Sequence, residues 1–177
     1  MISSRHVKFA VVKPVVLLLL LLVTGCGFSL RSSQQLTSQL PVLRLNLQQP
    51  GSDLSAQVQR GLRSAGVQVE LSDLATVNGA PVLSMDAERF ESRPVTVNPR
   101  AQAAQYSMQI SVTISLNGPG GVILEPDTLV VERLFFENIE TISGNLEEME
   151  VIRTEMRREL VDQLMRRLSA VTASGSR

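Results

Sequence analysis

Cys26 is the single cysteine of the 177-residue chain, and its surroundings suit one specific chemistry. It follows a basic segment at 1–13 and an unbroken apolar run at 15–23, and it stands directly after Val23-Thr24-Gly25. A branched apolar residue, two small residues and a cysteine form a lipobox. The small residues fit the cleft of a signal peptidase, and the thiol accepts a diacylglyceryl group. The apolar run is too short to span a bilayer as a helix, which needs about twenty residues.

We therefore expect residues 1–25 to be a cleaved lipoprotein signal peptide and Cys26 to be the lipidated first residue of the mature protein. Two or more acyl chains anchor a protein stably in a membrane. Gly27, in a position where Asp favours inner-membrane retention in enteric bacteria, indicates the outer membrane, facing the periplasm. The alternative is an ordinary secretory signal in which Cys26 is incidental.

The rest of the chain offers little for catalysis. The only histidine and both lysines lie in the leader, which excludes a Ser-His-Asp triad, a Schiff-base lysine and a zinc site with the usual ligands. No metal or cofactor is expected. After the leader, the chain has 14 arginines and 17 acidic residues, and aromatic residues make up 3% of the whole chain. This composition argues against nucleic-acid binding. Carboxylate pairs at 88/91 and 147/148 leave a hydrolase as a remote alternative.

Three arginines are candidates for binding an anion. Arg89, Arg93 and Arg100 bracket a polar, proline-bearing segment at 91–100. Guanidinium groups bind phosphate bidentately, so such a cluster suits anionic lipid head groups. The alternative is that these are scattered surface charges paired with nearby glutamates, Glu88 and Glu91.

Hydrophobic periodicity predicts one domain. The expected elements are strands at 42–47, 67–71, 82–90, 106–116 and 122–137, a helix from Ser52 or Asp53 to Gly66, a connection at 91–100, and a helix of about 25 residues capped by Asn145. Pro126 within a strand implies an edge, a bulge or a break. The prediction is an α+β fold: a two-layer sandwich with two helices packed on one face of a four- to five-stranded mixed sheet. We expect a tether at 26–41, a single α/β domain at 42–170 and a flexible tail at 171–177.

Two strands have unusual faces. Residues 106–116 alternate strictly, and their polar face carries Ser, Gln and Thr without a charge. Such a face suits contact with another surface, although a solvated Ser/Thr-rich face is an equal alternative. Residues 129–136 are apolar on both faces, which indicates either deep burial or a partner.

Several segments together resemble the LPS-assembly lipoprotein LptE family. They are Cys26-Gly27-Phe28-Ser29-Leu30-Arg31, the segment from Arg100 to Tyr106 before the alternating strand, Val130–Phe136, and the helix Glu155–Leu168. The order and spacing hold from 26 to about 170. A rival from another class is a stand-alone lipid- or peptidoglycan-binding lipoprotein without a barrel partner.

The resemblance implies a non-catalytic protein with two helices on a four-stranded sheet. It implies a one-to-one complex with the outer-membrane β-barrel LptD, inside which the lipoprotein sits as a plug while lipopolysaccharide is assembled at the cell surface. It also implies direct lipopolysaccharide binding through basic residues, for which Arg100 is the best match by position. A second basic position of the family falls on Ser143-Gly144 here, which is a departure from the family pattern.

Overall fold

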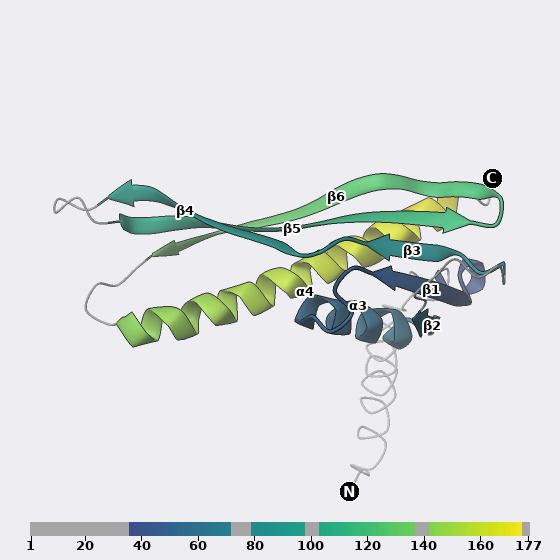
Figure 1. The fold of residues 1–177 in the computed structure, drawn as a ribbon, viewed down its shortest axis with the longest axis horizontal. Coiled ribbons are helices and arrows are strands. Elements are labelled where there is room, and N and C mark those ends of the chain that lie inside the picture. Colours follow the sequence, from purple (N-terminus) through teal and green to yellow (C-terminus); the bar gives the residue numbers. More distant parts are fainter. Residues whose placement is uncertain (1–35, 72–78, 98–102, 137–141, 175–177) are drawn as a thin grey trace, which may run out of the picture. The chain divides into compact units, whose positions relative to one another are not determined.

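The computed structural model describes residues 36–71, 79–97, 103–136 and 142–174, whose arrangement is shown in Figure 1. In chain order the elements are β1 (Val42–Leu47), α3 (Asp53–Ser64), β2 (Gln68–Leu71), β3 (Val82–Met85), β4 (Arg89–Val97), β5 (Ala103–Gly118), β6 (Gly121–Phe136) and α4 (Ile142–Ser174). Cys26, Arg100 and the predicted signal peptide lie outside the described residues.

A strand–helix–strand unit builds one end of the sheet. Ser52 caps α3, because its hydroxyl oxygen accepts a hydrogen bond from the backbone N–H of Ser55 at 3.2 Å. Gly66, with φ at 85°, follows the helix in the left-handed conformation that glycine adopts without strain. β1 and β2 pair in parallel. The predicted strand, helix and strand are therefore confirmed, with the helix as the crossover between parallel strands.

The next segment differs from the prediction. In place of one strand at 82–90 and a connection at 91–100, the chain forms β3 and β4, separated by a break at 86–88. β3 pairs with the C-terminal part of β5 and β4 with its N-terminal part, both antiparallel. The predicted connection is wrong because β5 is long enough to pair with it. Pro94, which lacks an N–H, is tolerated because β5 is the one strand of the described residues that pairs with β4.

β5 and β6 form a long antiparallel hairpin that turns between Gly118 and Gly121. Among the described strands β6 pairs only with β5, and the register shifts at the position of Pro126, so this proline lies on an edge strand and at a bulge. The sheet has six strands in the order β2-β1-β3-β5-β4, with β6 also on β5. The break at 86–88 accounts for the strand beyond the expected five.

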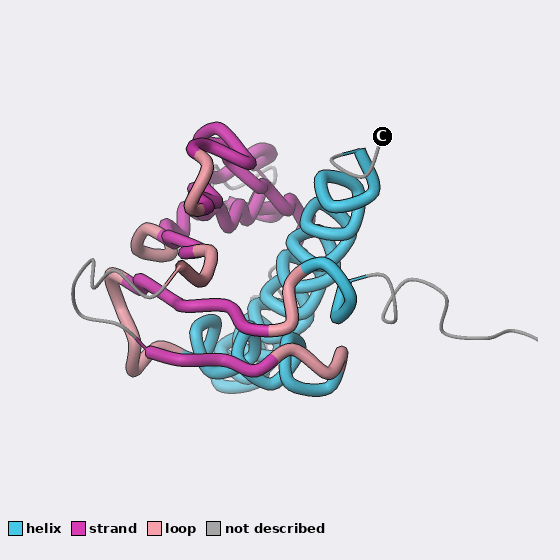
Figure 2. The backbone as a smooth tube through the Cα atoms, turned by 90° about the vertical axis from the view of Figure 1, so that its right-hand side faces the viewer, coloured by secondary structure: helices cyan, strands magenta, loops and turns pink. Residues whose placement is uncertain are grey.

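Both helices lie on one side of the sheet (Figures 1 and 2), which confirms the two-layer α+β sandwich. The core-facing row of β5 is buried and consists of Met108, Ile110, Val112, Ile114 and Leu116. The predicted stripe of α4 meets the core through Met156, Leu160, Leu164 and Leu168, each at most 2% exposed. Because all of this apolar surface packs on one face, the helices cannot also cover the other face.

α4 is longer than predicted at both ends. It begins at Ile142, so Asn145 lies inside the helix and is not its N-cap. It continues to Ser174, and Thr172 is buried with its hydroxyl donating to the Leu168 carbonyl at 3.0 Å. The expected flexible tail at 171–177 is therefore wrong as far as Ser174.

The folded domain also begins before residue 42. Leu36 and Leu40 are 0% and 3% exposed, and the Leu40 N–H donates to the Leu36 carbonyl at 2.8 Å. The Thr37 hydroxyl donates to the Ala65 carbonyl at 2.6 Å, beside the end of α3. Residues 36–41 thus belong to the domain and not to the tether. Two leucines four residues apart were the only signal of this in a polar segment.

α4 also covers part of the free edge of β6. Three of its side chains, spaced four residues apart and so on one face of the helix, contact this strand. Glu159 forms an ion pair with Arg133. The Gln163 amide donates to the Val130 carbonyl at 3.3 Å, and the Arg167 Nε lies 2.7 Å from an oxygen of Asp127. These contacts occupy backbone and side-chain groups that an open edge strand would otherwise present to another chain.

The early start of the domain can be tested with Leu36→Ala. Removing a fully buried leucine side chain lowers the free energy of unfolding by about 2–5 kcal/mol. The matched control is Leu71→Ala, because Leu71 is 58% exposed and exposed substitutions change stability by about 0.5 kcal/mol or less. Urea unfolding measures both. Equal stability of the two variants would contradict the placement of Leu36 in the core.

Candidate functional site

No described element packs on the face of the sheet opposite the helices (Figure 1). The uncharged polar row of β5 lies on this outer face, since it alternates with the buried row. It consists of Ser107, Gln109, Ser111, Thr113 and Ser115. The Ser107 hydroxyl donates to the Glu132 carboxylate of β6, and the hydroxyls of Thr113 and Thr128 lie 3.1 Å apart. The outer face therefore presents a band of hydroxyl and amide groups along β5.

β6 adds an apolar row to the same face. Val130, Leu134 and Phe136 are 42%, 55% and 68% exposed, whereas Val131 and Phe135, which alternate with them, are buried in the core. The strand that is apolar on both faces is thus buried on one face only. Large exposed apolar side chains in a row indicate an interaction surface.

β4 contributes two of the three predicted arginines. Arg89 and Arg93 are exposed and share a face of the strand, because they are four residues apart. Arg89 is opposite Ser111 and Arg93 is opposite Ser107. The structure therefore brings Arg89 and Arg93 together with the polar row of β5. Arg100, the third, is outside the described residues.

Two rows of side chains run across β4, β5 and β6 on the outer face, each from an arginine to an aliphatic residue. Arg93, Ser107 and Leu134 are neighbours across three strands, and so are Arg89, Ser111 and Val130. Neighbouring strands are about 4.8 Å apart, so each row runs from guanidinium to aliphatic side chain over roughly 10 Å between Cα atoms. We call this surface the outer patch: Arg89, Arg93, Ser107, Ser111, Val130, Leu134 and Phe136. Glu91 of β4 and Glu132 of β6 are both opposite Gln109 and lie between the two rows on the same face, so the outer face carries both signs of charge.

Glu88 is not a partner of these arginines. It forms a bidentate pair with Arg157 of α4, with distances of 2.9 Å to Nε and 3.1 Å to Nη2. The two side chains are 7% and 8% exposed. Within the described part of the chain, Arg89 and Arg93 form no ion pair, so the alternative in which they pair with Glu88 and Glu91 is wrong for these two residues. The sequence did not predict this buried pair, because the apolar stripe of α4 predicts burial for its leucines and gives no sign that Arg157 is buried too.

The Arg157 guanidinium is held in its charged form. Burial lowers the pKa of Arg157, but the hydrogen bonds and charge of Glu88, with the charges of Asp53 and Glu150, outweigh burial and raise the pKa above its ordinary value. Because the folded-state pKa is the higher one, this contribution to stability is fully present below the ordinary pKa and is lost only in strong alkali. The positive charge of Arg157 is therefore constant across physiological pH.

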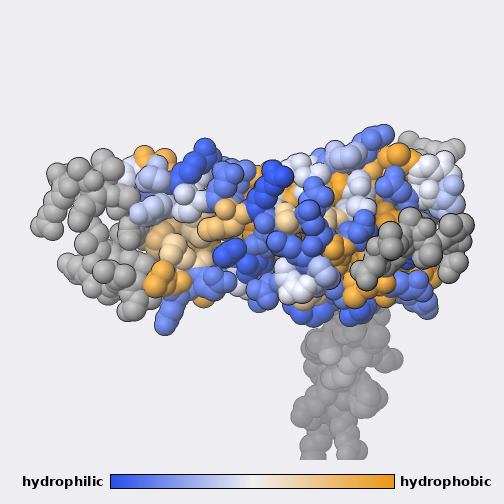
Figure 3. Space-filling model, in the orientation of Figure 1, coloured by the Kyte–Doolittle hydropathy of each residue, from blue (hydrophilic) through white to orange (hydrophobic). Residues whose placement is uncertain are grey.

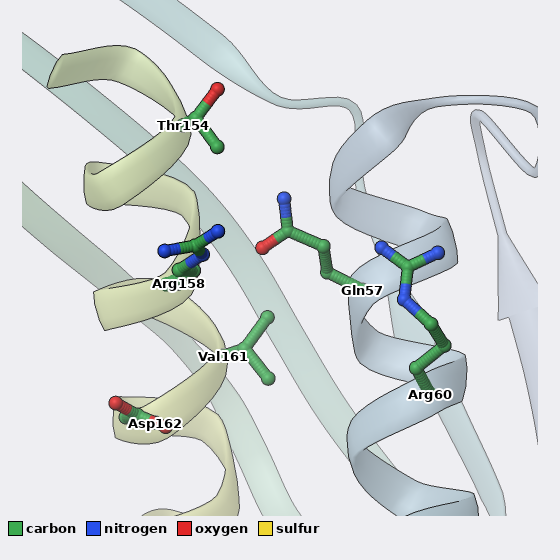
Figure 4. A pocket seen from close by; sticks show the side chains of 6 residues that line it. All are labelled: Gln57, Arg60, Thr154, Arg158, Val161 and Asp162. Carbon is green, nitrogen blue, oxygen red and sulfur yellow. The ribbon is translucent and has the colours of Figure 1, made fainter. Parts of the chain in front are cut away.

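A second feature is an open groove between α3 and α4, shown in Figure 4. Its volume is about 510 Å³, and it is lined by Gln57, Arg60, Thr154, Arg158, Val161 and Asp162. Both signs of charge line this groove, so it is unlike the enclosed apolar cavity expected of a stand-alone lipid-binding protein. Figure 3 shows polar, charged and apolar groups mixed over this side of the domain; the exposed apolar residues of α4 include Leu146 and Val151.

In the four described ranges, no cluster of His, Cys, Asp and Glu has the arrangement to hold a metal ion. No helix among these residues is long and apolar enough to cross a membrane.

Comparison with known proteins agrees with this fold and these motifs. Residues 42–168 match the family LptE, described as lipopolysaccharide-assembly. The LPS-assembly lipoprotein LptE of Pectobacterium atrosepticum is 30% identical over 170 residues, covering 96% of this chain and 89% of the relative. That of Yersinia pestis is 31% identical over 157 residues, covering 89% and 74%.

Solved structures agree with the fold. A crystal structure of rare lipoprotein B from Shewanella oneidensis has a TM-score of 0.68 at 21% identity, covering 77% of this chain and 99% of that one. A minor lipoprotein from Acinetobacter baumannii has a TM-score of 0.59 at 23% identity, covering 74% and 92%. Given the family match over most of the domain and relatives of this similarity along nearly the whole chain, the chain belongs to the LptE family of lipopolysaccharide-assembly lipoproteins.

Proposed function

We propose that this chain is a lipid-anchored outer-membrane lipoprotein that binds the β-barrel LptD one-to-one, supports it as a plug, and contacts lipopolysaccharide directly. The observation that carries the proposal is the uncovered outer patch on a rigid two-layer domain. Family membership supplies the class of process. The proposed role is binding and assembly, and it includes no catalytic step.

The proposed anchor is a lipidated Cys26, after removal of residues 1–25. Leu36 already belongs to the domain core, so the tether has only about ten residues. An extended chain spans at most about 3.6 Å per residue, which limits the tether to about 35 Å. The anchor therefore holds the domain close to the periplasmic leaflet and raises its effective concentration at a barrel in the same membrane.

The proposed barrel contact uses β5 and β6. The lumen of an outer-membrane barrel is polar, and the hydroxyl and amide groups of the β5 row can exchange hydrogen bonds with such a wall. Val130, Leu134 and Phe136 add apolar area at one side of this band. Burying it contributes about 25 cal/mol for each Å² removed from water.

The proposed lipopolysaccharide contact uses the arginines. Arg89 and Arg93 are exposed and have no ion pair with another described residue, so their guanidinium forks are available to the phosphates of lipid A. Arg100, three residues beyond the end of β4, is proposed as the third member. With Ser143-Gly144 at the family's second basic position, the charge for this contact would come mainly from the β4 side.

The barrel contact predicts that Leu134→Arg weakens the complex. A charge buried against the barrel wall is costly to desolvate, and we expect recovery of LptD with the tagged protein to fall by about tenfold or more. Leu71→Arg is the matched control, because Leu71 is similarly exposed on β2, away from the outer patch. Co-purification from detergent-solubilised membranes measures both variants. Undiminished recovery with Leu134→Arg would contradict the contact.

The lipopolysaccharide contact predicts that Arg93→Glu and Arg100→Glu each weaken binding. Reversing the charge replaces a bidentate phosphate contact by repulsion, so we expect a loss of about tenfold in affinity for each, with no loss of fold. Arg63→Glu, an exposed arginine on α3, is the control. Binding of purified protein to immobilised lipopolysaccharide, with circular dichroism to check folding, decides the matter. Equal affinity of all three variants and the parent would remove the arginines from the site.

A further inference from the structure

We infer that Glu88 is a positioning residue which, with Arg153 and Arg157 of α4, fixes the arginines of β4 on the outer face of the sheet. Glu88 does not itself contact a ligand in this arrangement, since it lies on the helix side. The inference rests on the proposed function, because it explains how one part of the outer patch is held in place.

The bond between Glu88 and Arg157 fixes the start of β4 to α4. Both oxygens of the Glu88 carboxylate accept from the Arg157 guanidinium, at 2.9 and 3.1 Å, and both side chains are nearly buried. A bidentate pair of this kind fixes orientation as well as distance. Asp53, at the start of α3, lies 3.5 Å from the same guanidinium. Glu88 therefore ties the start of β4 to both helices.

Arg153 of α4 contacts the residues on both sides of Arg89. Its Nη2 donates to Glu88 at 3.3 Å, and its guanidinium carbon lies 4.5 Å from the centre of the Phe90 ring. Glu88 and Phe90 are the residues before and after Arg89. Since alternate residues of a strand point to opposite faces, holding both neighbours against α4 directs Arg89 to the outer face. Arg93, four residues further along the strand, follows the same alternation.

The cluster lies at the break between β3 and β4, where strand hydrogen bonds are missing. Residues 86–88 form no strand, and one backbone bond, from the Asp86 N–H to the Thr113 carbonyl at 3.0 Å, joins this break to β5. The side chains of α4 thus hold the chain at a point where strand hydrogen bonds to β5 are missing. Without them, the break would be held by the bond from Asp86, by a second bond from the Ala87 N–H to the Gln48 side-chain oxygen at 2.7 Å, and by the β4–β5 ladder.

Removing the charge of Glu88 should therefore loosen β4 locally. In Glu88→Gln, two cations, of which Arg157 is 8% exposed and Arg153 33% exposed, lose their shared partner. We expect the backbone amides of 89–93 to exchange with solvent about tenfold faster, while those of β1 and α3 keep their rates. Affinity for lipopolysaccharide should fall by a similar factor, although Glu88 lies on the opposite face.

The test compares the full-length lipidated protein with Glu88→Gln and with Asp86→Asn. Asp86 is exposed and lies in the same break, so its substitution removes the same charge without touching the cluster. Hydrogen exchange read by mass spectrometry reports on β4, and binding to purified lipopolysaccharide reports on function. Faster exchange confined to β4 and weaker binding in Glu88→Gln, with neither in Asp86→Asn, is the expected result.

Unchanged exchange of β4 in Glu88→Gln overturns the inference, and so does an equal acceleration throughout the domain, which would show a general stabilising role only. If the parent protein does not bind lipopolysaccharide, the proposed function fails, while the exchange pattern still decides whether Glu88 positions β4. Should Glu88→Gln fail to fold, Arg153→Met takes its place. It removes the contacts to Glu88 and Phe90 but keeps the Arg157 pair, and unaltered exchange of β4 in that variant overturns the inference.

Discussion

The buried pair between Glu88 and Arg157 joins the parts of this domain that the backbone ladder leaves apart. It sits at the break between β3 and β4, on the inner face of the sheet, and reaches α4 directly and α3 through Asp53. A buried ion pair is weak support for stability by itself, because desolvation opposes the attraction between the charges. Here its consequence is geometric: it sets how the strand that carries Arg89 and Arg93 lies against the long helix.

One-sided burial produces the functional surface. α3, α4 and the buried apolar side chains pack on the inner face, so the outer face of β4, β5 and β6 remains without a described partner. Strand pairing then aligns Arg89 and Arg93 of β4 with hydroxyls of β5 and with Val130 and Leu134 of β6, while Glu91 and Glu132 lie between these two rows. Such a surface suits a partner that is itself amphiphilic, and the scaffold beneath it is rigid because the core is continuous with α4.

Periodicity alone predicted the layers, the first strand–helix–strand unit and the long alternating strand, because each of these has one buried face and a clear period. It failed where pairing decided the structure. Residues 91–97 look like a loop until β5 is available to pair with them, and Leu36 and Leu40 look like part of a tether until the end of α3 packs beside them. Arg89 and Arg93 were found by residue type, but their alignment with Ser111 and Ser107 required the register, which a single sequence does not reveal.

In the proposed function, the outer patch binds a barrel partner. The most direct measurement is affinity purification of the tagged, lipidated protein from detergent-solubilised outer membranes, with mass spectrometry of the proteins that accompany it. We expect a large β-barrel protein of the LptD kind in a one-to-one ratio. Recovery of a stable lipoprotein alone would contradict this role and favour a stand-alone lipid- or peptidoglycan-binding protein.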